Sequence, residues 1–396
     1  MIHKLILFKG DVETLEYFSE QMRETFIELG YQVFVFDYKD QERSLKKLRK
    51  FVDKGRTAAV TFNFIGIDDH ELFSEKNGEL FFDVFDVLCI NIMVDHPFYY
   101  HPILMQMPKH TIQLCIDRQH LAYVNRFFPQ IAHTGFLPLA GTKVWKEGRA
   151  DIPYEEREMD IVFTGNYASP SNFEKHITRI DEEYEAFYYG IIHELIEYPD
   201  TPMDWCMEKH LLRELEDEKT EENLRDAMAT MQFIDLYVRM YFRGEAVKAL
   251  VDGGLKVHVF GAGWDKLSVN NPENLIIGEA CSSEECLEHI ANAKISLNVM
   301  PWFKDGAHDR IFNTMMNGAV ALSDGSTYLE EVFADATHLV YYNLASIERL
   351  PELAKEILAN PEKAKRMIVE GSKKTSREHT WKQRAEAIHT WICKYS

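Results

Sequence analysis

The sequence predicts an α/β protein of two doubly wound domains, each a parallel sheet with helices on both faces. At 396 residues the chain is too long for one ordinary core, so two domains are expected. Short, nearly continuous apolar runs recur along it, as strands buried on both faces require. Segments with helical spacing of apolar residues separate these runs, which favours parallel strands joined by crossover helices.

The first half begins with a strand, a helix and a second strand. Residues 4–8 are apolar, and the next segment repeats apolar residues at spacings of three and four (Leu15, Phe18, Met22, Phe26 and Leu29). Gly30 is expected to end this helix, and residues 32–36 to begin the next strand. Further strands are predicted at 58–65, 87–94, 112–115 and 135–138.

A charged segment at 145–158 is interpreted as a linker between domains covering 1–150 and 151–378. Residues 379–396 are assigned to a final helix that packs back on the first domain. An acidic, helical stretch at about 172–250 is predicted to be an insertion in the second domain. The strands expected there are 161–164, 256–260, 275–277, 295–300, 319–323 and 338–341.

The composition argues against several classes of function. A net charge of −20 disfavours duplex nucleic acid as a partner, because phosphate binding needs a concentrated cationic surface. No apolar stretch approaches the roughly 20 residues of a membrane span, and residues 1–8 are interpreted as a strand, not a signal peptide. The cysteines are scattered, which favours reduced thiols over a zinc site. A cytoplasmic, metal-free protein is expected.

The most informative stretch follows the predicted strand at 295–300. A polar loop containing Asp305 and His308 leads to a helix that begins near Asp309. In open α/β sheets ligands bind beyond the carboxyl ends of strands, and a helix start there suits a phosphate. Arg310 adds a planar fork that matches diphosphate oxygens. The alternative is an ordinary amphipathic helix whose polar face, with Asn313 and Asn317, is solvated.

Two further loops follow strands in the same domain. Gly261 and Gly263, followed by Trp264, would allow a ligand to approach the backbone closely. The third glycine of the dinucleotide fingerprint is missing, which disfavours an oxidoreductase. Gly165 and Asn166 occupy the corresponding position after another strand, where a plain turn is equally possible.

A third polar cluster consists of Asp324, Ser326 and Thr327, between a strand and a helix. Ser326 or Thr327 is a good candidate for the helix N-cap, with an acid three or four residues later. Alternatively, the Asp324 carboxylate could bind sugar hydroxyls.

In the first half, Asp95 and His96 lie at a strand end and precede an aromatic cluster that could line a sugar site. A lone histidine is more often structural than catalytic, and the same applies to His101. Asn63 and Gly66, also beyond a strand, are weaker candidates.

Taken together, these motifs resemble those of the CgeB-like, group 1 type of GT-B glycosyltransferases. The similar segments are 94–97, 161–165, 239–254, 261–264, 310–320, 323–324, 328–333 and 379–388. The resemblance implies two Rossmann-like domains that face a cleft, with the acceptor on the first. It also implies a nucleotide-diphosphate-sugar donor on the second domain, with no metal required.

The resemblance also implies roles for individual residues. Arg310 matches the family's arginine and would stabilise the leaving diphosphate, with Asp95 or His96 facing the acceptor or anomeric carbon. Trp264 would pack beside the donor, and the base would contact the main chain at Ile277 and Gly278. The remaining expected donor residues are Gly165, Asn166, Gly261, Gly263, Asp305, His308, Asn313, Asp324, Ser326 and Thr327.

One departure from the family pattern affects the expected mechanism. Related retaining enzymes carry two glutamates eight positions apart, where this chain has Asp305 and Asn313. Asn313 can form hydrogen bonds but cannot act as a base. A retaining hexosyltransferase is expected, acting on a protein, glycan or small molecule. A non-catalytic binding module and, with less support, a sugar-nucleotide epimerase are the alternatives.

Overall fold

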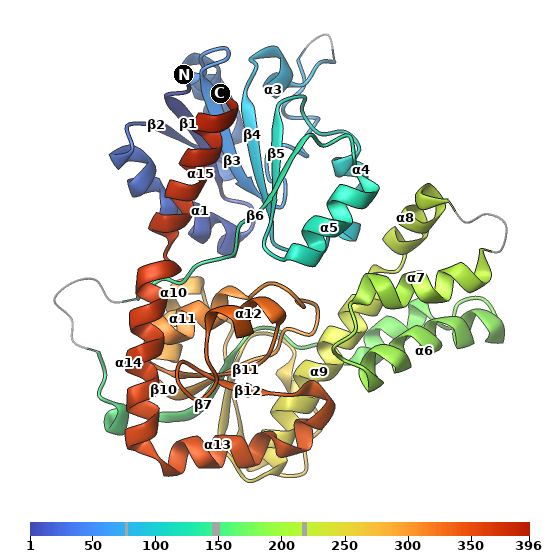
Figure 1. The fold of residues 1–396 in the computed structure, drawn as a ribbon, viewed down its shortest axis with the longest axis vertical. Coiled ribbons are helices and arrows are strands. Elements are labelled where there is room, and N and C mark those ends of the chain that lie inside the picture. The colour runs from blue at the N-terminus through green and yellow to red at the C-terminus, as the bar shows by residue number, and fades with distance from the viewer. Residues whose placement is uncertain (76–77, 145–150, 216–219) are drawn as a thin grey trace. The chain divides into compact units, whose positions relative to one another are not determined.

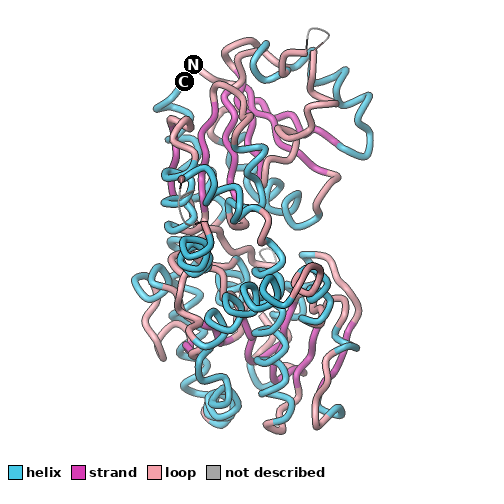
Figure 2. Tube along the Cα trace, turned by 90° about the vertical axis from the view of Figure 1, so that its right-hand side faces the viewer, coloured by secondary structure: helices cyan, strands magenta, loops and turns pink. Residues whose placement is uncertain are grey.

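The computed structural model describes residues 1–75, 78–144, 151–215 and 220–396, which form two compact units (Figures 1 and 2). Unit 1 comprises Met1–Ala140 and His379–Ser396, and unit 2 comprises Gly141–Glu378. Each contains a six-stranded parallel sheet flanked by helices, so the predicted fold class is confirmed. Part of the predicted linker, residues 145–150, lies outside the described residues.

The sheet of unit 1 has the order β2-β1-β3-β4-β5-β6. Its strands are β1 (Lys4–Lys9), β2 (Gln32–Asp37), β3 (Thr57–Phe62), β4 (Leu88–Met93), β5 (Thr111–Cys115) and β6 (His133–Phe136). The predicted strand 58–65 ends at Phe62, because Asn63 and Phe64 have positive φ angles of 45° and 66°. The side-chain amide of Asn91 anchors this turn, since its Oδ1 accepts a hydrogen bond from the Phe64 backbone N–H at 2.7 Å.

The helices of unit 1 include one from each end of the chain. They are α1 (Glu13–Glu28), α2 (Gln41–Phe51), α3 (Phe81–Val84), α4 (His101–Leu104), α5 (Arg118–Phe127) and α15 (Trp381–Tyr395). The predicted apolar face of α1 is buried, and α15 lies beside it (Figure 1). The ring centroids of Phe18 and Trp381 are 4.7 Å apart, so the end of the chain completes the core of unit 1.

The sheet of unit 2 has the order β12-β11-β10-β7-β8-β9. Its strands are β7 (Met159–Thr164), β8 (Val257–Phe260), β9 (Leu275–Gly278), β10 (Ala293–Asn298), β11 (Val320–Asp324) and β12 (Val340–Tyr342). The chain winds outward from β7 in one direction and from β10 in the other. Their carboxyl ends are therefore the topological switch point, where ligands of open α/β sheets bind.

The helices of unit 2 form two groups. The sheet is covered by α9 (Gln232–Asp252), α10 (Ser283–Ala291), α11 (Asp309–Met316), α12 (Thr327–Val332), α13 (Leu350–Ala359) and α14 (Pro361–Glu378). The helices α6 (Glu182–Glu197), α7 (Met203–Glu214) and α8 (Glu221–Ala229) stand to one side of the sheet in Figure 1. Within the described part of the chain, no helix is long and apolar enough to cross a membrane.

Candidate functional site

Arg310 lies at the switch point of unit 2 and links the two strands that define it. Its Nε donates to Thr164 Oγ1 at 3.2 Å, at the end of β7. Its Nη1 donates to Asn298 Oδ1 at 2.8 Å, at the end of β10. The guanidinium also lies over the Phe163 ring, 4.8 Å from its centroid. The arginine that the sequence singled out is thus held in the crevice where the fold places ligands.

A second arginine, Arg243 on α9, lies beside the first. Its Nη1 donates to the carbonyl of Asn166 at 2.9 Å, in the loop that follows β7. Its guanidinium lies 5.9 Å from the Phe163 centroid, so both arginines contact one aromatic ring. Arg243 is 7% exposed, and its buried Nε has no hydrogen-bond partner among the described residues.

The charges around the two arginines are unbalanced. Arg239, one turn before Arg243 on α9, forms an ion pair of 2.5 Å with Asp235. Neither Arg243 nor Arg310 has a carboxylate within ion-pair distance in the part of the chain that the structure describes. Burial lowers the pKa of both guanidinium groups, which stay protonated because the ordinary pKa of arginine is so high. Two buried guanidinium groups with no described carboxylate at ion-pair distance are a candidate site for an anionic ligand, although Asp309 and Asp235 lie close enough to raise their pKa values.

The start of α11 contributes less to this site than the sequence suggested. His308 is the N-cap residue, and its Nδ1 accepts a hydrogen bond from the Arg310 amide at 3.2 Å. Burial and the nearby Arg310 lower the pKa of His308, whereas Asp309 Oδ1, 3.0 Å from the same Nδ1, acts in the opposite direction. Asp309 occupies the first helical position, where its negative charge already compensates the partial positive charge of the helix N-terminus. The guanidinium groups therefore provide the main attraction for an anion.

The loop that follows β7 (Gly165 and Asn166) and the loop that follows β8 (Gly261 and Gly263) are hydrogen-bonded to each other. The Ala262 amide donates to Asn166 Oδ1 at 2.9 Å, and the Tyr167 amide donates to the Ala262 carbonyl at 2.9 Å. A Cβ atom at Gly261 would lie 2.5 Å from the Gly165 carbonyl oxygen, and one at Gly263 would lie 2.0 Å from that of Tyr167. The glycines permit this close packing, which positions Asn166 for its contact with Arg243.

Trp264 and, on β9, Ile277 and Gly278, all expected to contact the donor, differ in their exposure to solvent. The Trp264 side chain has no exposed surface, and its Nε1 donates to the Gly165 carbonyl at 2.8 Å. We therefore correct its assignment from a donor contact to a core residue that supports the loop. Ile277 is exposed, whereas Gly278 packs against the Phe260 ring. A base contact at Ile277 and Gly278 stays a prediction.

The polar face of α11 is not solvated. Asn313 Oδ1 accepts from the Thr142 amide at 2.8 Å, and its Nδ2 donates to Asp309 Oδ2 at 2.9 Å. Asn317 accepts from the Val144 amide and donates to the Thr142 carbonyl, both at 2.8 Å. Both amides hold the connecting segment at 142–144, so the solvated face that we considered is wrong, whereas donor binding by Asn313 stays a prediction. An amide suits position 313 because a glutamate could not donate to Asp309.

We expect Asn313→Asp to lower the free energy of unfolding by roughly 1–3 kcal/mol at pH 7. The aspartate keeps the acceptor for Thr142 but places a second carboxylate against Asp309 and removes the donor. The measurement is urea unfolding of the variant beside the parent protein. Adding Asp309→Asn should recover part of the loss, because the donor and acceptor are then exchanged. Equal losses in the single and double variants would contradict this arrangement.

The capping interpretation holds for the loop before α12. Ser326 is the N-cap: its Oγ accepts from the Leu329 amide at 3.1 Å and donates to the Gly306 carbonyl at 2.6 Å. Thr327 is exposed, and its hydroxyl donates to Asp305 Oδ1 at 2.7 Å. The Ser326 hydroxyl is therefore already engaged in capping the helix and in bonding the Gly306 carbonyl. Donor contacts of Asp305 and Thr327 stay predictions.

Asp324, at the end of β11, is buried beneath the same loop. Its two oxygens lie 2.9 and 3.1 Å from the Met300 amide, which donates to them. Burial raises the pKa of Asp324 to about 7, although Lys304 and the Met300 amide act in the opposite direction. The carboxyl therefore titrates near neutral pH, and its backbone contact supports a structural role over sugar binding.

We expect Asp324→Asn to gain stability relative to the parent protein as the pH rises. The folded pKa exceeds the ordinary value of 3.8, so the stability that Asp324 contributes is present at low pH and lost as the pH rises through 7. Asparagine has no such charge to bury. Urea unfolding between pH 5 and 9 should show the difference growing by roughly 2–4 kcal/mol. The exposed Glu273→Gln is the control; a pH-independent difference for Asp324→Asn would refute the expectation.

The candidate residues of unit 1 are held in a separate polar network. Asp95 is half-buried and accepts from Asn63 Nδ2 at 2.9 Å. His96 is 4% exposed and accepts from the Phe98 amide at 3.3 Å. Burial, with His120 and His101 nearby, lowers the pKa of His96 well below its ordinary value. His96 is thus buried in the core of unit 1, and its catalytic role stays a prediction.

Two of the three weaker candidates of unit 1, His101 and Gly66, have packing contacts in the core. His101 is buried, and its Nε2 lies 3.0 Å from the Tyr123 hydroxyl. Gly66 accommodates the Phe8 ring, which a Cβ atom at this position would approach to 2.2 Å. Asp95 and Asn63, which are hydrogen-bonded to each other, are the candidates of unit 1 without such a packing role.

Comparison with known proteins agrees with this architecture. Residues 243–390 match the family model described as Glycosyl transferase-like, and no curated protein matches the chain significantly. The sucrose-phosphate synthase of Thermosynechococcus elongatus is similar over 99% of this chain and 98% of its own, at 9% identity and a TM-score of 0.55.

Two similar structures were solved with a nucleotide sugar. HepE of Anabaena, in complex with UDP-glucose, covers 99% of both chains at 8% identity and a TM-score of 0.52. An alpha-glucosyltransferase in complex with UDP-glucose and DNA containing an abasic site covers 98% of both chains, at 10% identity and a TM-score of 0.53. The chain thus has the GT-B fold of these structures, and its residues 243–390 are similar to the Glycosyl transferase-like family.

Proposed function

We propose that the chain transfers a sugar from a nucleoside-diphosphate sugar, with Arg243 and Arg310 holding the diphosphate at the carboxyl ends of β7 and β10. The observation that carries the proposal is the burial of both arginines with no carboxylate at ion-pair distance among the described residues. Burying a guanidinium costs several kcal/mol unless an anion compensates it, and a diphosphate supplies that charge. The position at the switch point fits a nucleotide.

In this mechanism the two guanidinium groups act on the leaving group. Negative charge develops on the diphosphate as its bond to the anomeric carbon breaks, and preorganised cations in a buried site stabilise that charge strongly. Two fixed cations can replace a divalent metal in this role, so we propose a metal-independent reaction. The UDP-glucose bound in two similar structures makes a uridine-diphosphate hexose the first donor to test.

We further propose retention of the anomeric configuration and a protein, glycan or small-molecule hydroxyl as acceptor. Asn313 stands where related retaining enzymes carry a glutamate, and its amide, which is bonded to Thr142 and Asp309, cannot act as a base. In the proposed retaining reaction, the acceptor hydroxyl attacks the anomeric carbon from the same face of the sugar that the diphosphate leaves. The described cysteines are free thiols, which supports a cytoplasmic location.

The first test is a thermal-shift screen with uridine, guanosine and thymidine diphosphates and their hexoses, in EDTA and in magnesium. We expect one nucleotide to raise the Tm equally in both. Arg243→Met, which keeps the length of the side chain but removes its charge, should reduce this shift without changing nucleotide preference. A shift that requires magnesium would contradict metal independence, and an unchanged shift in Arg243→Met would remove Arg243 from the site.

The second test incubates the protein with the preferred nucleotide sugar. Release of free nucleoside diphosphate without acceptor supports a transferase, whereas a rearranged sugar would show an epimerase. Tight binding with neither product, also with acceptors present, would show a binding module. NMR spectra of the first product formed would show whether the anomeric configuration is retained.

A further inference from the structure

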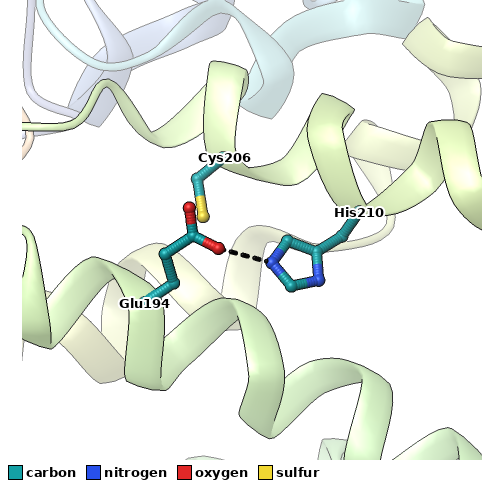
Figure 3. Close-up of side chains that lie close together, drawn as sticks. All are labelled: Glu194, Cys206 and His210. Atoms are coloured by element: carbon teal, nitrogen blue, oxygen red, sulfur yellow. Dashed lines mark hydrogen bonds and ion pairs between the residues drawn. The ribbon is translucent and has the colours of Figure 1, made fainter.

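Glu194, Cys206 and His210 form a cluster of potential metal ligands in the helices beside the unit 2 sheet (Figure 3). Glu194 lies on α6, and the other two lie on α7, four residues apart and hence on one face of that helix. One donor atom from each residue lies within 4.8 Å of the other two. Figure 3 shows the carboxylate, the thiol and the imidazole turned toward one another.

The polar contacts leave these donor atoms available for a cation. Glu194 Oε2 lies 2.9 Å from His210 Nε2, while Oε1 is bound by Lys209 Nζ at 2.6 Å. The Cys206 thiol is 1% exposed, and its contact with the Ile191 carbonyl is long, at 3.9 Å. Lys209 thus fixes the carboxylate through one oxygen and leaves the other facing the imidazole and thiol.

We propose that Glu194, Cys206 and His210 bind a divalent zinc ion that ties α6 to α7. Nitrogen, sulfur and carboxylate oxygen are the ligands zinc prefers, and three protein ligands with one water complete its tetrahedral shell. Zinc–ligand lengths of about 2.0–2.3 Å separate tetrahedral ligands by about 3.3–3.6 Å. Glu194 Oε2 and His210 Nε2 are 2.9 Å apart, and the three donor atoms all lie within 4.8 Å of one another, so small side-chain rotations would bring them into place.

The competing explanation is a simple ion-pair cluster in which Lys209, Glu194 and His210 join the two helices. It accounts for those three residues, but it gives no role to the thiol that completes the cluster. Burial and the nearby Glu194 raise the pKa of Cys206 to about 12, so without a cation the thiol is neutral. A bound zinc ion would favour the thiolate. Sequence spacing alone missed the site because Glu194 comes from another helix.

Cobalt(II) titration of chelator-treated protein tests the proposal. We expect one equivalent to bind with an intense near-ultraviolet thiolate band and the visible bands of a tetrahedral site, both abolished by zinc. Cys206→Ser should remove the thiolate band, and His210→Gln and Glu194→Gln should each weaken binding at least about tenfold. Lys209→Met and the exposed Cys393→Ser are the controls and should retain the spectrum.

Stability provides a second readout that does not depend on enzymatic activity. Zinc should raise the Tm of the parent protein and of Lys209→Met, but not that of Cys206→Ser. If Cys206→Ser does not fold by circular dichroism, His210→Gln provides the same comparison. An octahedral cobalt spectrum, a thiolate band that survives Cys206→Ser, or no zinc-dependent Tm shift would overturn the proposal and leave the ion-pair cluster.

Discussion

Arg310→Ala should lower turnover of the preferred nucleotide sugar by about 10²–10³-fold, because it removes a charge that the leaving diphosphate needs. The substitution leaves Thr164 and Asn298 without their shared donor, so some loss of stability is also expected. Arg310→Lys should remain impaired, because one ammonium cannot reproduce the guanidinium's fork between the two strand ends. The measurement is kcat and kcat/KM for release of the nucleoside diphosphate.

The matched control is the exposed Arg366→Ala in the same unit, which should behave like the parent protein. Nucleotide-induced Tm shifts, each taken relative to the same variant without nucleotide, separate binding from stability. If Arg310→Ala lowers the Tm while its nucleotide shift and turnover stay normal, Arg310 only joins β7 to β10. That result would refute the role of Arg310 at the diphosphate. The nucleotide-induced Tm shift of Arg243→Met would then show whether Arg243 binds the nucleotide without Arg310.

The fold was predictable because strand burial leaves a strong local signal. The runs that became β4, β5 and β10 are buried along nearly their whole length, so their apolar sequences mark them as central strands. The boundary error after β3 arose at Asn63, where a polar side chain in a left-handed conformation ends the strand inside an apolar sequence. Such a turn depends on long-range bonds to β4 that no local pattern reveals.

The candidate site was less predictable, because its residues are decided by tertiary partners. Arg310 was found because it follows a strand end, where position alone suggests function. Asn313 shares that helix face, but its partner Thr142 lies far away in sequence, so its structural role was invisible. Arg243 was missed, although Asp235, Arg239 and Arg243 repeat every four residues on α9. One acid for two arginines on a largely buried helix is a signal of an anion site.

Gly263→Ala should lower the free energy of unfolding by about 3 kcal/mol or more, the largest stability effect we expect from a single methyl group. Gly263 has a φ of 87°, a conformation that costs roughly 1–2 kcal/mol for a residue with a Cβ atom. The added methyl would also lie 2.0 Å from the Tyr167 carbonyl oxygen. That carbonyl cannot move freely, because the Tyr167 amide is bonded to Ala262 in the same pair of loops.

Gly254→Ala separates the two causes, because Gly254 has a φ of 84° but nothing within 4 Å of an added Cβ. It should therefore show the conformational cost alone, about 1 kcal/mol in urea unfolding. Gly263→Ala should also weaken nucleotide binding, since displacing the Tyr167 loop moves the Asn166 carbonyl that holds Arg243. If the two variants lose equal stability and bind nucleotide alike, the contact between the glycine loops is not what positions the diphosphate site.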